Sequence, residues 1–200
     1  MVDLTNVKVI KSLMQKYDLN FLHGLGQNFI VNSDVVLKMI NESGIHKSAV
    51  VLEIGTGIGT LTKELVNAAS EVVTIEIDKK LIPLIKENLK DFNNITILND
   101  DFLKIDLKNL WDKYFTNREV FICANLPYYI TSAIIVKILN SRLNFNSLTV
   151  MVQKEVAQRI CAPLGSRNSS ALSVLVNYFC KPEYLFTVNK ENFIPCDKSN

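Results

Sequence analysis

A regular alternation of two kinds of segment constrains the fold of this 200-residue chain more than any other feature. Short apolar runs rich in β-branched residues predict strands, which we expect at residues 49–54, 72–77, 95–98, 120–124 and 148–152. A segment with helical spacing of apolar residues follows each run, at residues 61–67, 79–89, 107–114, 132–139 and 155–160. Because right-handed crossovers place the helices on both faces of a parallel sheet, the expected fold class is α/β, with a doubly wound, mostly parallel sheet.

Helices are also predicted on either side of this alternation. Before it we expect an amphipathic helix at residues 6–17, a turn-prone segment at residues 20–32, and a helix that Ser33 and Asp34 cap and Gly44 closes. After it the pattern predicts a helix at residues 169–179 and a last strand at residues 184–188.

The composition is that of a folded, water-soluble domain, with 48% hydrophobic and 21% charged residues. With no linker or repeat in view, we predict one domain over residues 1–200, with an N-terminal helical, substrate-side segment at residues 1–45 and a Rossmann-like core at residues 46–200. No apolar run has signal-peptide quality or approaches the roughly 18 residues of a membrane span. We therefore expect a cytoplasmic protein without a membrane partner.

The cysteines and the net charge say less about function. The four cysteines, Cys123, Cys161, Cys180 and Cys196, form no C-x-x-C pair and have no histidine near them, so we expect reduced, mostly buried thiols and no metal site. The net charge of +2 does not by itself indicate a nucleic-acid binder. We expect a monomer.

A glycine loop follows the first strand of the alternation. Gly55, Gly57 and Gly59 stand at the carboxyl end of that strand, where ligands bind in open α/β sheets. A dinucleotide fingerprint, G-x-G-x-x-G, would require glycine in place of Thr60. The carboxylate of Glu53, two residues before the first glycine, suits a cationic sulfonium or ammonium ligand better than a pyrophosphate.

Further carboxylates follow the next two strands. Glu76 ends the second strand, where an acidic side chain can accept both hydrogen bonds of a ribose diol, and Asp78 is its rival for that role. Asp100 and Asp101 close the third strand, where an adenine amino group could donate to one of them. Each residue alone is more often a cap or a solvated loop residue, but their repetition at successive strand ends indicates a ligand site.

A second motif, Asn125-Leu126-Pro127-Tyr128, follows the fourth strand. Asn and Pro are common in simple turns, which is the alternative interpretation. The exocyclic amine of a nucleobase is a weak nucleophile, and the Asn125 oxygen with a backbone carbonyl of the turn can accept its two N–H bonds. Tyr128 can stack on the base and stabilise developing positive charge. The base must then be unpaired or turned out of its stack.

Together these residues resemble the bacterial KsgA family of small-subunit rRNA adenine N6,N6-dimethyltransferases and its eukaryotic counterparts. The chain is similar to that family from about Leu25 to Lys198. The matching motifs are Leu25-Gly-Gln-Asn-Phe29, Glu53-Ile-Gly-Thr-Gly-Ile-Gly59, Asn125-Leu-Pro-Tyr128, Gln153-Lys-Glu-Val156 and Ala171-Leu-Ser-Val174. Leu126 favours the small-subunit enzymes over the related erythromycin-resistance methylases, which usually have isoleucine there.

The resemblance implies a Rossmann-like methyltransferase fold and dimethylation of two adjacent adenosines near the 3′ end of 16S rRNA, in the immature 30S subunit. S-adenosylmethionine is the implied methyl donor. Family members usually continue into a small helical domain, which we expect these 200 residues to lack.

The matching motif positions also imply the roles of single residues. The implied cofactor contacts, including the residues of the glycine loop, are Asn28, Ile30, Glu53, Gly55, Gly57, Gly59, Glu76, Asp101 and Asn125. The implied catalytic group that holds the target amine and base is Asn125, Leu126, Pro127 and Tyr128, with Phe193 as a second aromatic. Phe193 could equally be a core residue. Two other functions stay open: an RNA-binding assembly factor that keeps the cofactor pocket, and a nicotinamide-dependent dehydrogenase, which Thr60 disfavours.

Overall fold

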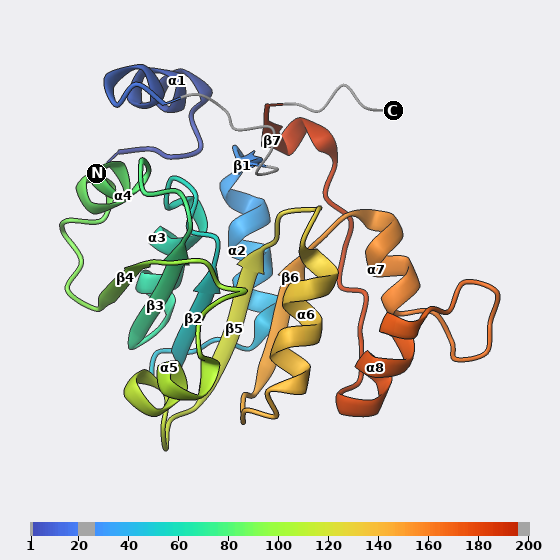
Figure 1. Ribbon diagram of the computed structural model, residues 1–200. Coiled ribbons are helices and arrows are strands. Elements are labelled where there is room, and N and C mark those ends of the chain that lie inside the picture. Colours follow the sequence, from blue (N-terminus) through green and yellow to red (C-terminus); the bar gives the residue numbers. More distant parts are fainter. Residues whose placement is uncertain (1, 20–26, 196–200) are drawn as a thin grey trace.

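The computed structural model describes residues 2–19 and 27–195. Its main sheet has five strands, all parallel, in the order β4-β3-β2-β5-β6 (Figure 1). The strands are β2 (Val50–Ile54), β3 (Glu71–Glu76), β4 (Ile95–Asn99), β5 (Val120–Asn125) and β6 (Ser147–Met151). The predicted doubly wound parallel sheet is confirmed, and each strand lies within about one residue of its predicted bounds.

Eight helices surround the strands in the part of the chain that is described. They are α1 (Val7–Lys16), α2 (Ser33–Ser43), α3 (Thr60–Ala68), α4 (Ile82–Asn88), α5 (Leu107–Tyr114), α6 (Thr131–Asn140), α7 (Lys154–Ile160) and α8 (Ala171–Phe179). A helix was predicted at each of these positions. The N-cap of α2 is Asn32, whose side chain accepts from the backbone N–H of Asp34, and not Ser33 or Asp34 as expected; Gly44 closes the helix at φ +78°.

Both faces of the sheet are buried, as parallel strands with helical crossovers require. Side chains alternate along each strand, so Leu52 and Ile122 pack with α5 and α6 on one face, while Val51 and Cys123 pack with α2 and α3 on the other. Figure 1 shows α6 in front of the sheet and α2 behind it. No described helix has the length and apolar composition needed to cross a bilayer.

The strand order reverses between β2 and β5. The chain runs from β2 outward through β3 to β4, then returns to β5 on the other side of β2 and continues to β6. Loops that leave the carboxyl ends of β2 and β5 therefore diverge, and they leave a crevice there. The glycine loop and the Asn-Leu-Pro-Tyr motif are those two loops.

A second, two-stranded sheet was missed by the sequence analysis. It pairs β1 (Phe29–Ile30) antiparallel with β7 (Phe193–Ile194), after a short 3-10 helix, η2 (Lys190–Asn192). The Asn32 amide also donates to the Asn192 side-chain oxygen at 2.8 Å. This pairing brings the end of the described chain beside the N-terminal segment. The rest of the predicted turn at residues 20–26, with Leu25 and Gly26 of the first motif, lies outside the described residues.

The predicted last strand at residues 184–188 is wrong. That segment forms no ladder in the described structure, where β6 pairs only with β5. The segment and β6 both line one large cavity of about 1190 Å³. An apolar run becomes a strand only where a neighbour can hydrogen-bond to it. The cysteine expectation holds in part, since Cys123 is buried and Cys161 half-buried, but Cys180 is exposed; Cys196 is not described.

Candidate active site

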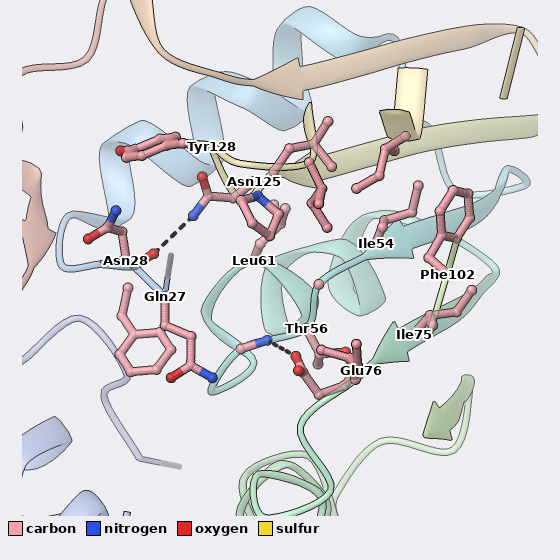
Figure 2. Close-up of a pocket in the computed structure, with 18 of the residues that line it drawn as sticks. Gln27, Asn28, Ile54, Thr56, Leu61, Ile75, Glu76, Phe102, Asn125 and Tyr128 are labelled. Atoms are coloured by element: carbon pink, nitrogen blue, oxygen red, sulfur yellow. Dashed lines mark hydrogen bonds between the residues drawn. The ribbon is translucent and has the colours of Figure 1, made fainter. Parts of the chain in front are cut away.

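A cavity opens at the carboxyl edge of the sheet, above the point where the strand order reverses (Figure 2). Its walls come from the segment before β1, the glycine loop, and the loops after β3, β4 and β5. The predicted cofactor residues that line it are Asn28, Ile30, Gly55, Gly57, Glu76, Asp101 and Asn125. Segments separated by up to a hundred residues thus meet in one concave, mostly apolar site with a few polar groups, as small-molecule sites require.

The glycine loop packs tightly against the N-terminal segment. Gly57 has a φ of +58°, and a Cβ placed on it would lie 3.4 Å from the Phe29 ring. Its backbone N–H donates to Oε2 of Glu76 at 2.8 Å. Glycine at this position therefore provides both a left-handed turn and close approach of neighbouring groups.

Glu76 is held by the loops on both sides of it. Besides the bond from Gly57, its Oε1 accepts from the backbone N–H of Asp78 at 2.9 Å. The side chain is only 4% exposed, and burial raises its pKa, while the bonds from Asp78 and Gly57 act in the opposite direction. Each carboxylate oxygen keeps a lone pair for a further donor. Asp78, the rival candidate, is not among the residues that line the cavity.

The loop after β4 contributes two carboxylates and an aromatic ring. Oδ1 of Asp101 accepts from the backbone N–H of Leu103 at 3.0 Å, and Oδ1 of Asp100 accepts from that of Asp101 at 2.7 Å. Both residues line the cavity together with Phe102, whose ring is 5% exposed. This wall offers an apolar surface beside hydrogen-bond acceptors, which matches a purine base.

Asn125 is the last residue of β5, and a hydrogen bond orients its side-chain amide group. Its Nδ2 donates to the backbone carbonyl of Asn28 at 3.1 Å, and Figure 2 shows the two side by side with Tyr128. Because the donor end is engaged, the Oδ1 of Asn125 is the end that can accept from a ligand. This hydrogen bond joins residues that are 97 positions apart in sequence.

The rest of the motif forms a tight turn into α6. Leu126 is 1% exposed, and its backbone N–H donates to the Met151 carbonyl at 3.0 Å. The Pro127 carbonyl accepts from the Thr131 hydroxyl at 2.9 Å and from the Ile130 N–H. Since the Pro127 carbonyl is engaged in starting the helix, the Leu126 carbonyl is the candidate for a second acceptor.

Tyr128 stands between two cavities. It lines the site described above, and with Asn28 it also lines the larger cavity beside β6. Phe193 lines only the larger one, and it is also packed against the core cluster of α2 and α3. Both interpretations of Phe193 therefore describe part of its environment. The two aromatic residues face one space, into which a nucleobase could enter next to Asn125.

Glu53 and Gly59 are not brought to the cavity. Gly59 caps α3 at φ +92°, with Leu89 packed against it. Glu53 is fully buried on the α3 face, where the hydroxyls of Thr62 and Thr74 each donate to Oε2 at 2.7 Å. The carboxylate of Glu53 was expected at the ligand site, but it lies on the other face of the sheet. Side chains alternate along a strand, and Ile54 is the residue that lines the cavity.

Several residues that line the cavity were not predicted. They are Gln27, Thr56, Ile58, Thr60, Leu61, Ile77, Phe102, Tyr129, Ile130 and Ile134, with the strand residues Phe29, Ile54 and Ile75. Tyr129 is notable because burial, and then the negative charges of Asp101 and Glu76, raise the pKa of its hydroxyl. Its position directly after the Asn-Leu-Pro-Tyr motif was a usable signal, whereas the apolar residues carry no pattern that separates them from core.

The pKa of Glu53 gives a testable pH dependence of stability. Burial raises this pKa to about 8, so the folded protein holds a proton there that the unfolded chain releases near pH 4.5. Stability should therefore decrease as the pH rises from about 5 to 8, by up to roughly 1.4 kcal/mol per pH unit. Glu53→Gln, which keeps an acceptor for both threonines, should flatten this decrease in urea unfolding at pH 5.5, 7 and 8.5. Parallel profiles for the two proteins would contradict the assignment.

Comparisons with known proteins identify the family. The family described as "Ribosomal RNA adenine dimethylase" matches residues 18–200. This chain belongs to that family. A "Ribosomal RNA small subunit methyltransferase A" of Clostridium botulinum is 43% identical over 94% of this chain and 67% of its own length. The protein of the same name from Clostridioides difficile is 40% identical, over 96% of this chain and 66% of its own.

Solved structures agree with membership of the ribosomal RNA adenine dimethylase family. A dimethyladenosine transferase from Plasmodium falciparum superposes with a TM-score of 0.72 and 34% identity, over 84% of this chain and 59% of that one. The 23S rRNA methyltransferase ErmE gives a TM-score of 0.61 and 29% identity, over 73% and 55%. The chain spans about two thirds of the length of the curated relatives.

The family confirms the predicted fold and class of reaction. The fold is that of Rossmann-like methyltransferases, and the reaction is rRNA adenine dimethylation with S-adenosylmethionine as methyl donor. The dehydrogenase interpretation does not agree with these findings, and nothing in them favours an assembly factor without activity.

In residues 2–19 and 27–195 no group of three or more His, Cys, Asp or Glu residues is placed to hold a metal ion.

Proposed function

We propose that this chain dimethylates the N6 amines of two adjacent adenosines near the 3′ end of small-subunit rRNA, within immature 30S particles. It acts as a cytoplasmic monomer and needs no metal ion, and residues 1–200 work as one domain, with residues 1–45 on the substrate side of the core at residues 46–200. The observation that carries the proposal is the orientation of Asn125 by the Asn28 carbonyl, at the border between the two cavities. This arrangement suits an enzyme that must hold a primary amine beside a methyl donor.

The residues of the first cavity fit S-adenosylmethionine. Glu76 would accept hydrogen bonds from the ribose hydroxyls, Asp101 from the adenine amino group, and Phe102 would pack on the adenine ring. Asn28, Ile30, Gly55 and Gly57 would enclose the rest. When bound, the cofactor supplies an electrophilic methyl group on a sulfonium. The positive φ of Gly57 disfavours any side chain in the loop that lines this cavity, which supports a glycine-built cradle for the cofactor.

The second cavity would receive the target base. Oδ1 of Asn125 and the Leu126 carbonyl would each accept a hydrogen bond from one N–H group of the adenine amine. These bonds would direct the lone pair of the amine toward the methyl group. Tyr128 and Phe193 would stack on the base after it leaves the helical stack. Pro127 stiffens the turn that places these acceptors. No general base with a tuned pKa is required before attack, since the amine nitrogen loses its proton to solvent only as it gains the methyl group, and the sulfonium would leave as a neutral thioether.

The proposal predicts selective binding followed by transfer. In calorimetric titrations the purified chain should bind S-adenosylmethionine with a micromolar dissociation constant and show no heat with NADH. Immature small subunits should then accept labelled methyl groups, with N6,N6-dimethyladenosine as the product after nuclease digestion. Binding without transfer would mean that residues 1–200 do not suffice for the subunit. Absence of binding would overturn the assignment of the cavity.

A further inference from the structure

Lys137 of α6 reaches out of its own helix and holds the loop that follows β4. Its Nζ donates to the backbone carbonyls of Leu103 at 2.8 Å and Ile105 at 2.6 Å. A lysine in the last turn of a helix commonly interacts with the carbonyls of that helix. Here both partners belong to another segment, 34 and 32 residues away in sequence. The lysine therefore ties α6 to the loop at residues 100–105.

That loop is one wall of the first cavity. It carries Asp100, Asp101 and Phe102, all of which line the site. The backbone of Leu103 is held at both of its polar groups, because its N–H donates to Asp101 and its carbonyl accepts from Lys137. The Nζ also lies 5.6 Å from the centroid of the Phe102 ring. Lys137 thus bonds to the loop at two carbonyls, and its ammonium group lies near the Phe102 ring that lines the cavity.

The surroundings of Lys137 act on its charge in two opposite directions. Burial lowers the pKa of Lys137, whereas the carboxylates of Asp101, Asp106 and Asp100 act against that decrease. A partly buried ammonium group satisfied by carbonyls is costly to replace, since its removal leaves those acceptors unpaired. α6 begins at Thr131, three residues after Tyr128, so the helix that carries Lys137 is the one that follows the Asn-Leu-Pro-Tyr motif.

We propose that Lys137 is a positioning residue for the adenine end of the cofactor: it fixes the loop at residues 100–105 so that Asp101 and Phe102 form a preorganised adenine subsite. This inference rests on the proposed function of the first cavity. Lys137 itself does not line the cavity and needs no contact with the cofactor.

The test compares Lys137→Met with wild type by calorimetry and steady-state kinetics. Lys137→Met keeps the aliphatic stem and removes the cation and its donors. The substitution should weaken the binding of S-adenosylhomocysteine and of 5′-methylthioadenosine by the same factor, about tenfold, because the part that these two ligands share is the adenosine end. The KM for S-adenosylmethionine should rise to the same extent while kcat stays within about twofold. Lys137→Arg, which keeps the charge and the donors, should recover most of the affinity.

Lys47→Met is the matched control. Lys47 also donates to a backbone carbonyl, that of Asn67, but it lies at the amino end of the sheet, far from the cavity. It should leave both dissociation constants unchanged. Unchanged affinities in Lys137→Met together with a lower melting temperature would overturn the inference and leave a purely structural lysine. If Lys137→Met does not fold, Lys137→Gln decides the same comparison. Failure of the wild-type chain to bind S-adenosylhomocysteine would instead count against the proposed function.

Discussion

Replacement of Asn125 by alanine is expected to lower methyl transfer by at least about a hundredfold, because one oriented polar group at a reacting centre is worth roughly that much. Alanine removes the acceptor that holds the target amine, and it also removes the bond to the Asn28 carbonyl. The wall of the cofactor cavity loses only one side chain, so the dissociation constant for S-adenosylmethionine should change by less than about threefold. Single-turnover transfer of labelled methyl groups to immature subunits measures the first effect, and calorimetry the second.

Asn125→Asp separates the orientation of the amide from the mere presence of an acceptor. The carboxylate keeps two acceptor oxygens, but one of them would face the Asn28 carbonyl, 3.1 Å from the present donor. Two acceptors at that distance repel, so we expect this variant to be nearly as inactive as alanine. Asn67→Ala, which removes a surface amide bonded to Lys63, is the matched control and should be fully active. Normal turnover in Asn125→Ala would exclude the assigned role.

The sheet could be predicted from sequence because its central strands, β2, β3 and β5, are buried on both faces. Such strands are continuous apolar runs, and β2 and β5 are visible as such without any partner. The pair of β1 and β7 could not be found in this way. Each strand has two residues, which are too few to show a period of two, and the two strands lie more than 160 residues apart in sequence. The segment at residues 184–188 shows the reverse case, an apolar run without a neighbour to pair with.

The site was predictable in its location but not in its side-chain directions. The position of a loop at the carboxyl edge follows from the strand order, so Gly55, Asp101 and Asn125 converge as expected. Glu53 lies away from the cavity, because a single residue of register decides which face of the sheet a side chain joins. Its neighbours Thr62 and Thr74 supply hydroxyls that accommodate a buried carboxyl group, and no local pattern indicates that contact.

Contacts from one segment to another explain the remaining gap. The bond from Asn125 to Asn28 and those from Lys137 to the loop after β4 join positions that share no motif. The sequence alone does not predict these contacts, because they depend on how the fold places distant segments side by side. Substitutions that test such contacts are therefore the most informative ones for this chain.

Glu76→Ala should give the largest loss of cofactor affinity, about a hundredfold, since it removes an acceptor that could bond to both ribose hydroxyls. It also releases the backbone N–H groups of Gly57 and Asp78, which the carboxylate now holds. Calorimetry with S-adenosylmethionine measures the effect. Glu71→Ala, at the opposite end of the same strand, is the matched control and should bind normally. Wild type and both variants should show no heat with NADH, and an unchanged dissociation constant for S-adenosylmethionine in Glu76→Ala would remove the ribose assignment.

The raised pKa of Glu76 adds a second, independent signature. Ribose hydroxyls donate to the ionised carboxylate, and burial raises the pKa of this group, so affinity should fall as the pH is lowered through that raised value. Glu76→Gln cannot titrate, and its amide would also place a donor against the N–H of Gly57 or Asp78. It should bind weakly at every pH between 5 and 8, with a flat profile. If wild type shows the same flat profile, the carboxylate is not the group that recognises the ribose, because only an ionisable acceptor links binding to pH in this way.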